Sequence, residues 1–175
     1  LKEGRNLEAP IRKAYESELY GLKITRLFLP VEIRNIKILN KFYEDYTSHL
    51  PQFEATEYLG IIGIIGFSML IFIILKKVKI KNDILLFLAQ LNISAVLFST
   101  IGGFGVLFSL LITPQIRGYN RISVYIAYFS ILSTCVILTK LFEVKKFNKK
   151  YYVLIFLLFL FSIFEQIPIN RNDYK

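Results

Sequence analysis

The order of apolar and polar positions divides the chain into two parts near residue 57. Residues 1–57 mix apolar, acidic and basic positions throughout, whereas residues 58–175 contain four apolar stretches separated by polar segments. The stretches, none with a charged side chain, cover residues 58–75, 84–112, 122–139 and 151–164. About 17–25 apolar residues are typical of a helix that crosses a lipid bilayer. We therefore expect an all-α integral membrane protein with four transmembrane helices.

The second apolar stretch is too long for one straight crossing. Its 29 residues would extend over roughly 43 Å as a helix. Gly102, Gly103 and Gly105 predict a helix break within it. We expect a spanning helix over 84–101, then a short interfacial or re-entrant piece over 106–112; a single tilted helix is the alternative. The predicted transmembrane region, residues 58–167, then has its spans at 58–75, 84–101, 122–141 and 151–167.

Composition and charge favour a membrane over a nucleic-acid partner. The chain is 54% hydrophobic and carries a net charge of +9, from 22 Lys and Arg against 13 Asp and Glu. Basic and acidic residues balance within residues 1–57, so the whole excess lies in the apolar part. Nucleic-acid binders usually keep Lys and Arg on a polar surface. The 16 Phe and 11 Tyr exclude a disordered tail, and the single Cys excludes a disulfide scaffold.

The lysines predict the orientation of the helices. Residues 76–83 and 140–150 are short Lys-rich segments between predicted spans. Short Lys-rich loops stay on the cytoplasmic side of a membrane. Residues 1–57, the turn at 113–121 and the tail at 168–175 are then expected to face outward.

The segment before the first span has its own amphipathic pattern. Pro10 and Gly21 predict the start and end of a helix over 11–19, and a second helix is expected over 33–46. Between them lies an apolar cluster at 22–29. Such pieces either lie on the outer leaflet or pack on neighbouring helices. Because the segment has no net charge, attraction to anionic lipid is not expected to drive its binding.

The most unusual polar segment is residues 113–121, where Arg117 and Arg121 are four residues apart, with Tyr119 and Asn120 between them. If the third helix begins near Arg117, both guanidinium groups lie on one face at its outer end. Helix N-termini and arginines bind phosphate well. The segment is therefore a candidate lipid-phosphate site.

Simpler interpretations remain open for this segment and for other polar positions. The two arginines either bind phosphate or only anchor the helix at the headgroups and pair with acids such as Glu54 and Glu57. Glu165 is either an acid facing the substrate or an ordinary interfacial carboxylate. Small or polar side chains within the spans indicate helix packing, a ligand groove or a wet cavity; they are Gly60, Gly63, Gly66, Gln90 and Asn92. No metal site is expected, because His49 stands alone.

Two adjoining runs resemble a known family. Residues 99–109 (STIGGFGVLFS) and 113–127 (TPQIRGYNRISVYIA) resemble a block of bacterial polytopic membrane proteins labelled sugar translocase or phosphoglycerol-transferase-like. These proteins are similar to GT-C-type lipid-dependent glycosyltransferases. Residues 18–30, residues 58–67 and the Glu165-Gln166 pair before Pro168 also resemble family stretches.

The resemblance implies a lipid-phosphate-handling role for Arg117 and Arg121, with a polyprenyl-phosphate-linked donor and an envelope glycan as acceptor. The chain would be the C-terminal membrane fragment of a transferase of the bacterial cytoplasmic (inner) membrane. Its partners would be membrane lipid and the missing N-terminal part of the same chain, not nucleic acid. The fragment itself would carry no cofactor and be inactive alone, and its catalytic residue stays unassigned. The alternatives are a non-catalytic lipid-linked sugar translocase (flippase) and a structural membrane assembly module.

Overall fold

The computed structural model describes residues 12–29, 41, 44–46, 48, 57–75, 83–144 and 149–166. These residues form helices and turns, and an isolated parallel bridge pairs Leu22 with Thr100. The elements are α1 (Glu16–Leu19), the 3-10 helix η1 (Ile24–Leu27), α3 (Gly60–Leu75), α4 (Asp83–Ser99), α5 (Phe104–Leu111), the 3-10 helix η2 (Tyr119–Ile122), α6 (Ser123–Val144) and α7 (Lys149–Gln166). The predicted all-α class is thus confirmed for the described part of the chain.

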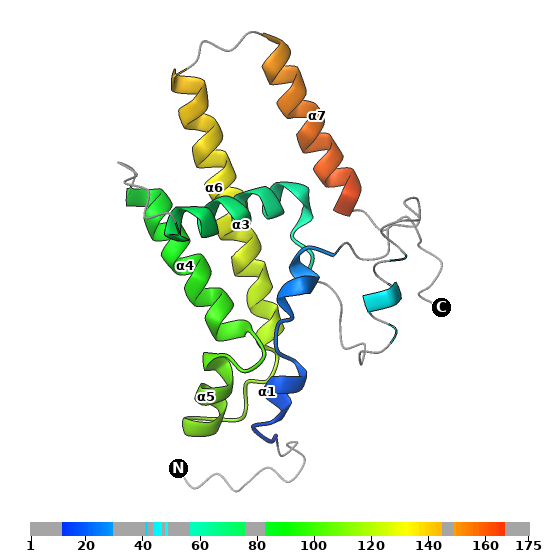
Figure 1. Cartoon of the computed structure of the whole chain (residues 1–175), viewed down its shortest axis with the longest axis vertical. Helices are drawn as coiled ribbons and strands as arrows, with labels where there is room; N and C mark the ends of the chain where they lie inside the picture. The colour runs from blue at the N-terminus through cyan, green and yellow to red at the C-terminus, as the bar shows by residue number, and fades with distance from the viewer. Residues whose placement is uncertain are drawn as a thin grey trace, which may run out of the picture.

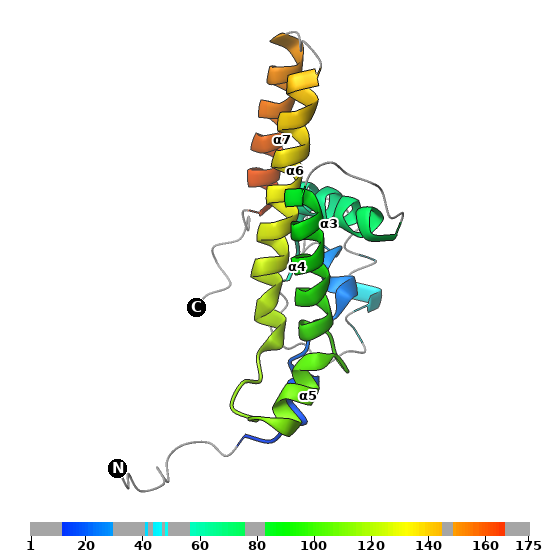
Figure 2. The same cartoon turned by 90° about the vertical axis from the view of Figure 1, so that its left-hand side faces the viewer.

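Helices α4 and α6 run side by side in opposite directions and form the centre of the structure (Figures 1 and 2). The axis of α3 lies across both of them. Helix α7 runs in the direction opposite to α6 but stands apart from it, and its C-terminal end reaches the beginning of α3 (Figure 1). Helices α1 and α5 lie together at the end of the molecule where α4 stops and α6 starts.

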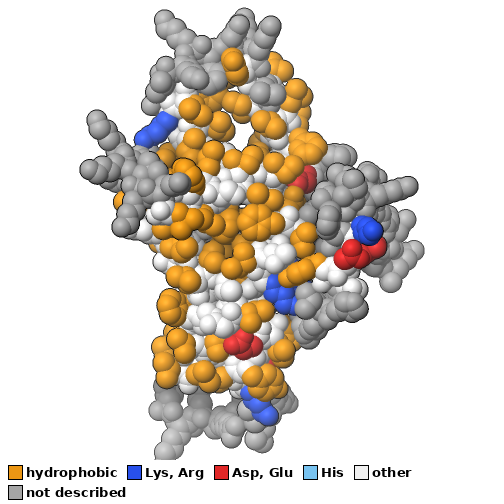
Figure 3. All heavy atoms as spheres, viewed as in Figure 1, with side chains coloured by type: hydrophobic (Ala, Val, Ile, Leu, Met, Phe, Trp, Pro, Cys, Tyr) orange, Lys and Arg blue, Asp and Glu red, His pale blue; other side chains and the backbone are white. Residues whose placement is uncertain are grey.

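One helix among the described residues is long and apolar enough to cross a membrane. It covers the 24 residues Tyr119–Phe142, which comprise η2 and most of α6. The segments Gly60–Leu75, Ile84–Ser99 and Tyr151–Ile163 are also apolar but shorter. The structure therefore shows one candidate span where the sequence predicted four. Hydrophobic side chains nevertheless form a broad exposed band over the helices on the face seen in Figure 3.

The predicted break after the second apolar helix is confirmed. Helix α4 ends at Ser99 and α5 begins at Phe104. Gly102, between them, has φ of 71°, in the left-handed region that favours glycine. The alternative of one continuous tilted helix is wrong. Most apolar side chains of the short α5 are exposed, with Leu111 82% exposed.

The crossing of α3 over α6 depends on small residues. A Cβ atom at Gly66 would clash with the carbonyl oxygen of Ser130, so only glycine permits this approach. The Ser133 hydroxyl donates to the Gly66 carbonyl at 3.4 Å, and the Thr134 hydroxyl donates to the Ile62 carbonyl at 3.3 Å. The packing interpretation of the glycine stripe is confirmed at Gly66.

The polar side chains of α4 do not share one surface. Asn92 is buried and donates from Nδ2 to the Ile126 carbonyl at 3.3 Å and to Ser130 Oγ at 3.1 Å. Gln90, in contrast, is exposed. Asn92 therefore joins α4 to α6. The two residues do not line a common wet cavity.

The helix predicted over 11–19 is shorter in the structure, where α1 covers only Glu16–Leu19. The chain leaves the helix because its next residues pair elsewhere. The Leu22 N–H donates to the Ser99 carbonyl at 2.8 Å, and the Leu22 carbonyl accepts from the Ile101 N–H at 3.3 Å. The helix predicted over 33–46 lies mostly outside the described residues, although 44–46 are helical.

Candidate functional site

Residues 12–29, here called the strap, cover the break between α4 and α5. Besides the Leu22 bridge, the Glu18 carboxylate accepts from the Gly102 N–H at 3.1 Å, and the Tyr20 carbonyl accepts from the Asn120 N–H at 3.1 Å. A broken helix leaves backbone groups without intrahelical partners. The strap supplies those partners and also holds residues 113–121 beside the break.

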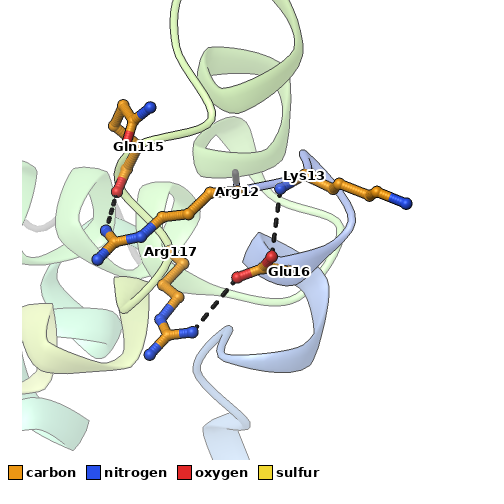
Figure 4. A network of polar contacts seen from close by, with 5 residues as sticks. All are labelled: Arg12, Lys13, Glu16, Gln115 and Arg117. Atoms are coloured by element: carbon orange, nitrogen blue, oxygen red, sulfur yellow. Dashed lines mark hydrogen bonds and ion pairs between the residues drawn. The ribbon is translucent and has the colours of Figure 1, made fainter. Parts of the chain in front are cut away.

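Figure 4 shows a second attachment of the strap, through Arg117. The Arg117 Nη1 lies 3.4 Å from the Glu16 Oε2. The other oxygen of this carboxylate, Oε1, accepts a hydrogen bond from the Lys13 N–H at 3.2 Å. The Arg117 Cζ also lies 4.8 Å from the centre of the Tyr20 ring, a cation–π contact. Nearby, the Arg12 guanidinium donates to the Gln115 carbonyl (Figure 4). The Arg117 side chain is still 47% exposed.

The structure separates the four residues predicted to bind lipid phosphate. Arg117 and Arg121 are exposed, whereas Tyr119 and Asn120 are buried. Helix α6 begins at Ser123, so the assumption that the third helix starts near Arg117 is wrong. Arg117 precedes the 3-10 turn η2, and Arg121 lies within it. The arginines therefore do not share the face of one α-helix.

Tyr119 belongs to the packing under the loop. Its ring centre is 5.7 Å from that of Phe98, and its ring atoms would contact a Cβ added at Gly105. Its hydroxyl is buried and has no hydrogen-bond partner among the described residues. Tyr119 thus fixes the loop to α4 and α5.

A buried polar cluster joins the strap, the start of α3 and the loop before α6. The Arg26 Nη1 lies 3.7 Å from the Glu57 Oε2, and the side chains are 9% and 3% exposed. Asn120 donates from Nδ2 to the other Glu57 oxygen at 3.2 Å. The proposed pairing of Glu57 with Arg117 or Arg121 is therefore replaced by pairing with Arg26. Glu54 lies outside the described residues.

Sequence reasoning missed Arg26 as a functional residue of this cluster. The available signal was a cation that interrupts an apolar run at 22–29. A buried charge needs a partner, but nothing in the local sequence indicated which acid, 31 positions later, would provide it. Lys23 lies beside the same cluster. Burial, and secondarily the charge of Arg26, lower the pKa of Lys23 below 10.5, while Glu57 opposes the shift.

Glu165 ties α7 to the beginning of α3. Its Oε1 accepts a hydrogen bond from the Tyr58 hydroxyl, and its Oε2 accepts from the Ile61 N–H at 3.1 Å. A carboxylate at a helix N-terminus is favourable because the first N–H groups have no intrahelical acceptor. These bonds give Glu165 a structural role, and the substrate-facing role stays a prediction.

The arrangement offers no metal centre within the described ranges, where no three His, Cys, Asp or Glu side chains gather closely enough to hold an ion. His49 lies outside those ranges. The site at the strap instead combines exposed guanidinium groups with the buried ion pair of Arg26 and Glu57. Such groups bind anions but supply neither a nucleophile nor a general base.

The comparisons with known proteins return no match: neither a family model, nor a curated protein, nor a solved structure is similar to this chain.

Proposed function

We propose that this chain is the membrane-embedded part of a protein that handles a lipid-phosphate-linked substrate. In this proposal, a sugar or phosphoglycerol group is transferred from a polyprenyl-phosphate-type donor to an envelope glycan at the outer face of the bacterial cytoplasmic membrane. The observation that carries it is the exposure of Arg117 and Arg121 directly before α6, the longest apolar helix described. Lipid phosphates are expected at that level of a bilayer.

Arg117 is suited to hold a phosphate because its position is already fixed. The Tyr20 ring and the Glu16 carboxylate restrict its guanidinium, so little side-chain entropy is lost when an anion binds. Glu16 also competes with that anion. A phosphate that carries more negative charge than a carboxylate would displace or share this contact.

Replacing Arg117 or Arg121 with Gln is expected to lower the affinity for polyprenyl phosphate about tenfold or more, because each substitution removes a charge-assisted hydrogen bond worth roughly 1.5–3 kcal/mol. Glu16→Gln is expected to raise the affinity, since it removes the competing carboxylate. The measurement is equilibrium binding of radiolabelled polyprenyl phosphate to the chain in detergent micelles. Lys140→Gln, an exposed change far along α6, is the control. Wild-type binding by an Arg117→Gln, Arg121→Gln double variant would reject the proposal.

The membrane topology belongs to the same proposal. It assigns spans to α3, α4, α6 and α7, with both ends of the chain outward and the Lys-rich segments at 76–83 and 140–150 cytoplasmic. The opposite directions of α4 and α6 (Figure 1) support it, because the start of one and the end of the other then point to one side. The proposal requires α3 to lie closer to the direction of α4 and α6 when it spans the bilayer, whereas in Figure 1 its axis lies across them.

Cysteine labelling in intact cells tests this topology. In a Cys135→Ser background, Gln115→Cys is expected to react with a membrane-impermeant maleimide, while Lys79→Cys and Lys146→Cys are protected. The reason is that short Lys-rich loops are retained in the cytoplasm. Permeabilised cells, in which all three must react, are the control. Labelling of Lys146→Cys in place of Gln115→Cys would reverse the orientation, and labelling of both Gln115→Cys and Lys79→Cys, with Lys146→Cys protected, would remove α4 from the spans.

A structural membrane assembly module is the second candidate function. It is favoured by the ion pair of Arg117 with Glu16 and by the burial of Tyr119 and Asn120. In that case the Glu16→Gln variant loosens the strap without raising phosphate affinity. The translocase alternative has less support, because Asn92 packs α4 on α6 and does not line a polar passage with Gln90.

A further inference from the structure

A groove of about 440 Å³ lies between α3, α6 and α7. Its size falls within the range of roughly 300–1,000 Å³ typical of small-molecule sites. The lining comes from the beginning of α3 and the residues before it, the first half of α6 and the last turns of α7. These residues are Tyr58, Leu59, Ile62, Gly63, Ala127, Ile131, Phe159, Ser162 and Ile163.

The lining is apolar, and its main polar group is already bonded. The Tyr58 hydroxyl donates to the Glu165 carboxylate, which leaves Ser162 as the other lining residue with a side-chain hydroxyl. A polar ligand would lose its bonds to water in such a groove without replacing them. The chemistry of the lining therefore selects a hydrocarbon.

The groove continues into the exposed apolar surface of the molecule. Ile131, Phe159 and Ile163 line it and yet are 43%, 55% and 44% exposed. They belong to α6 and α7, which contribute to the hydrophobic band seen in Figure 3. In a bilayer this band faces lipid, so a ligand enters the groove sideways from the hydrocarbon and not from water.

We propose that this groove holds one hydrocarbon chain of a membrane lipid between α3, α6 and α7. The hydrocarbon chain fills the space beside α6 that lies between the beginning of α3 and the last turns of α7. The proposal rests on the proposed function only in placing the protein in a membrane. It requires neither phosphate binding by Arg117 nor any transfer reaction.

The test uses the absence of tryptophan from the sequence. Phe159→Trp places a single fluorophore in the groove, and Phe156→Trp places one on the same helix, exposed and outside the lining. Both variants are reconstituted in vesicles of phosphatidylethanolamine and phosphatidylglycerol with brominated acyl chains, which quench tryptophan on contact. They are then transferred into detergent without bromine.

After transfer into detergent, we expect only the tryptophan in the groove to remain quenched. Phe156→Trp recovers its emission as surface lipid exchanges, whereas Phe159→Trp remains quenched by the held chain. Adding Ala127→Phe to Phe159→Trp fills the groove and abolishes the retained quenching, while Val124→Phe, an exposed change on α6, does not. The comparison of the two tryptophan variants stands even where Ala127→Phe fails to fold.

Two results would overturn the groove proposal. Equal recovery of Phe156→Trp and Phe159→Trp in detergent would show that no chain is held. An unquenched Phe159→Trp already in the brominated vesicles would show that protein, such as a second copy, fills the space. Wild-type phosphate binding by the Arg117→Gln, Arg121→Gln double variant, together with retained quenching of Phe159→Trp, would reject the proposed function alone, so the two failures are distinguishable.

Discussion

Replacing Glu57 with Ala is expected to destabilise the protein by about 3–5 kcal/mol, the usual cost of removing one partner of a buried ion pair. Glu57 is 4% exposed. Its carboxylate forms an ion pair with the Arg26 guanidinium and accepts a hydrogen bond from the Asn120 amide. Its loss removes the carboxylate that neutralises a buried cation and leaves the strap, α3 and the loop before α6 without their common contact. Reversible denaturant unfolding in detergent micelles measures the change.

The matched control is Glu16→Ala, which removes the exposed pair with Arg117 and should cost only about 0–1 kcal/mol. A double change, Arg26→Met with Glu57→Leu, is expected to recover much of the lost stability, because well-packed apolar side chains often replace a buried ion pair without loss. If Glu57→Ala proved no more harmful than Glu16→Ala, the pair would not hold the strap in place.

Gly66→Ala is the second change with a large expected effect, and its direction is informative. In a helix interior, Ala is ordinarily more favourable than Gly by about 1 kcal/mol. At Gly66 the added Cβ would clash with the backbone carbonyl of Ser130 on α6, which no side-chain rotation relieves. We expect a net loss of about 1–3 kcal/mol, the usual cost of overpacking, measured by the same unfolding experiment.

Gly118→Ala provides the comparison for this substitution. A Cβ at residue 118 would lie 3.4 Å or more from its nearest neighbours, and the residue has φ of −83°. Ala is therefore tolerated there, with an effect between zero and about 1 kcal/mol of stabilisation. An increase in stability for Gly66→Ala would mean that α3 does not approach α6 this closely.

The Glu57 prediction concerns how residues 113–121 are held at one end of the apolar helices. The buried cluster fixes this loop from within through Asn120, and Arg117 fixes it from outside through Glu16 and Tyr20. A phosphate site at the loop depends on this fixed position, because loosely held arginines gain little from binding. The Glu57 stability test therefore examines the support of the loop, and the phosphate-binding test examines the arginines that the loop carries.

The apolar stretches and the glycines by themselves determined the helices, because helix formation follows local sequence closely. Helices α3, α4, α6 and α7 lie where the apolar stretches predicted them, and the break at Gly102 was expected from glycines alone. The sequence also singled out residues 113–121 as unusual. Ser123, not Arg117, begins α6, because residues 119–122 first form a 3-10 turn whose buried side chains face α4 and the strap.

Only the tertiary structure decided which polar residues are engaged with one another. Charge counting gave residues 1–57 a balance of zero but did not reveal that Arg26 pairs with Glu57, or Glu16 with Arg117. Ion pairs between distant segments depend on how the chain returns on itself, and that path is set by packing. The direction of α3 across α6 was likewise undetermined by the sequence pattern, since a uniformly apolar helix presents no preferred face until the contact at Gly66 selects one.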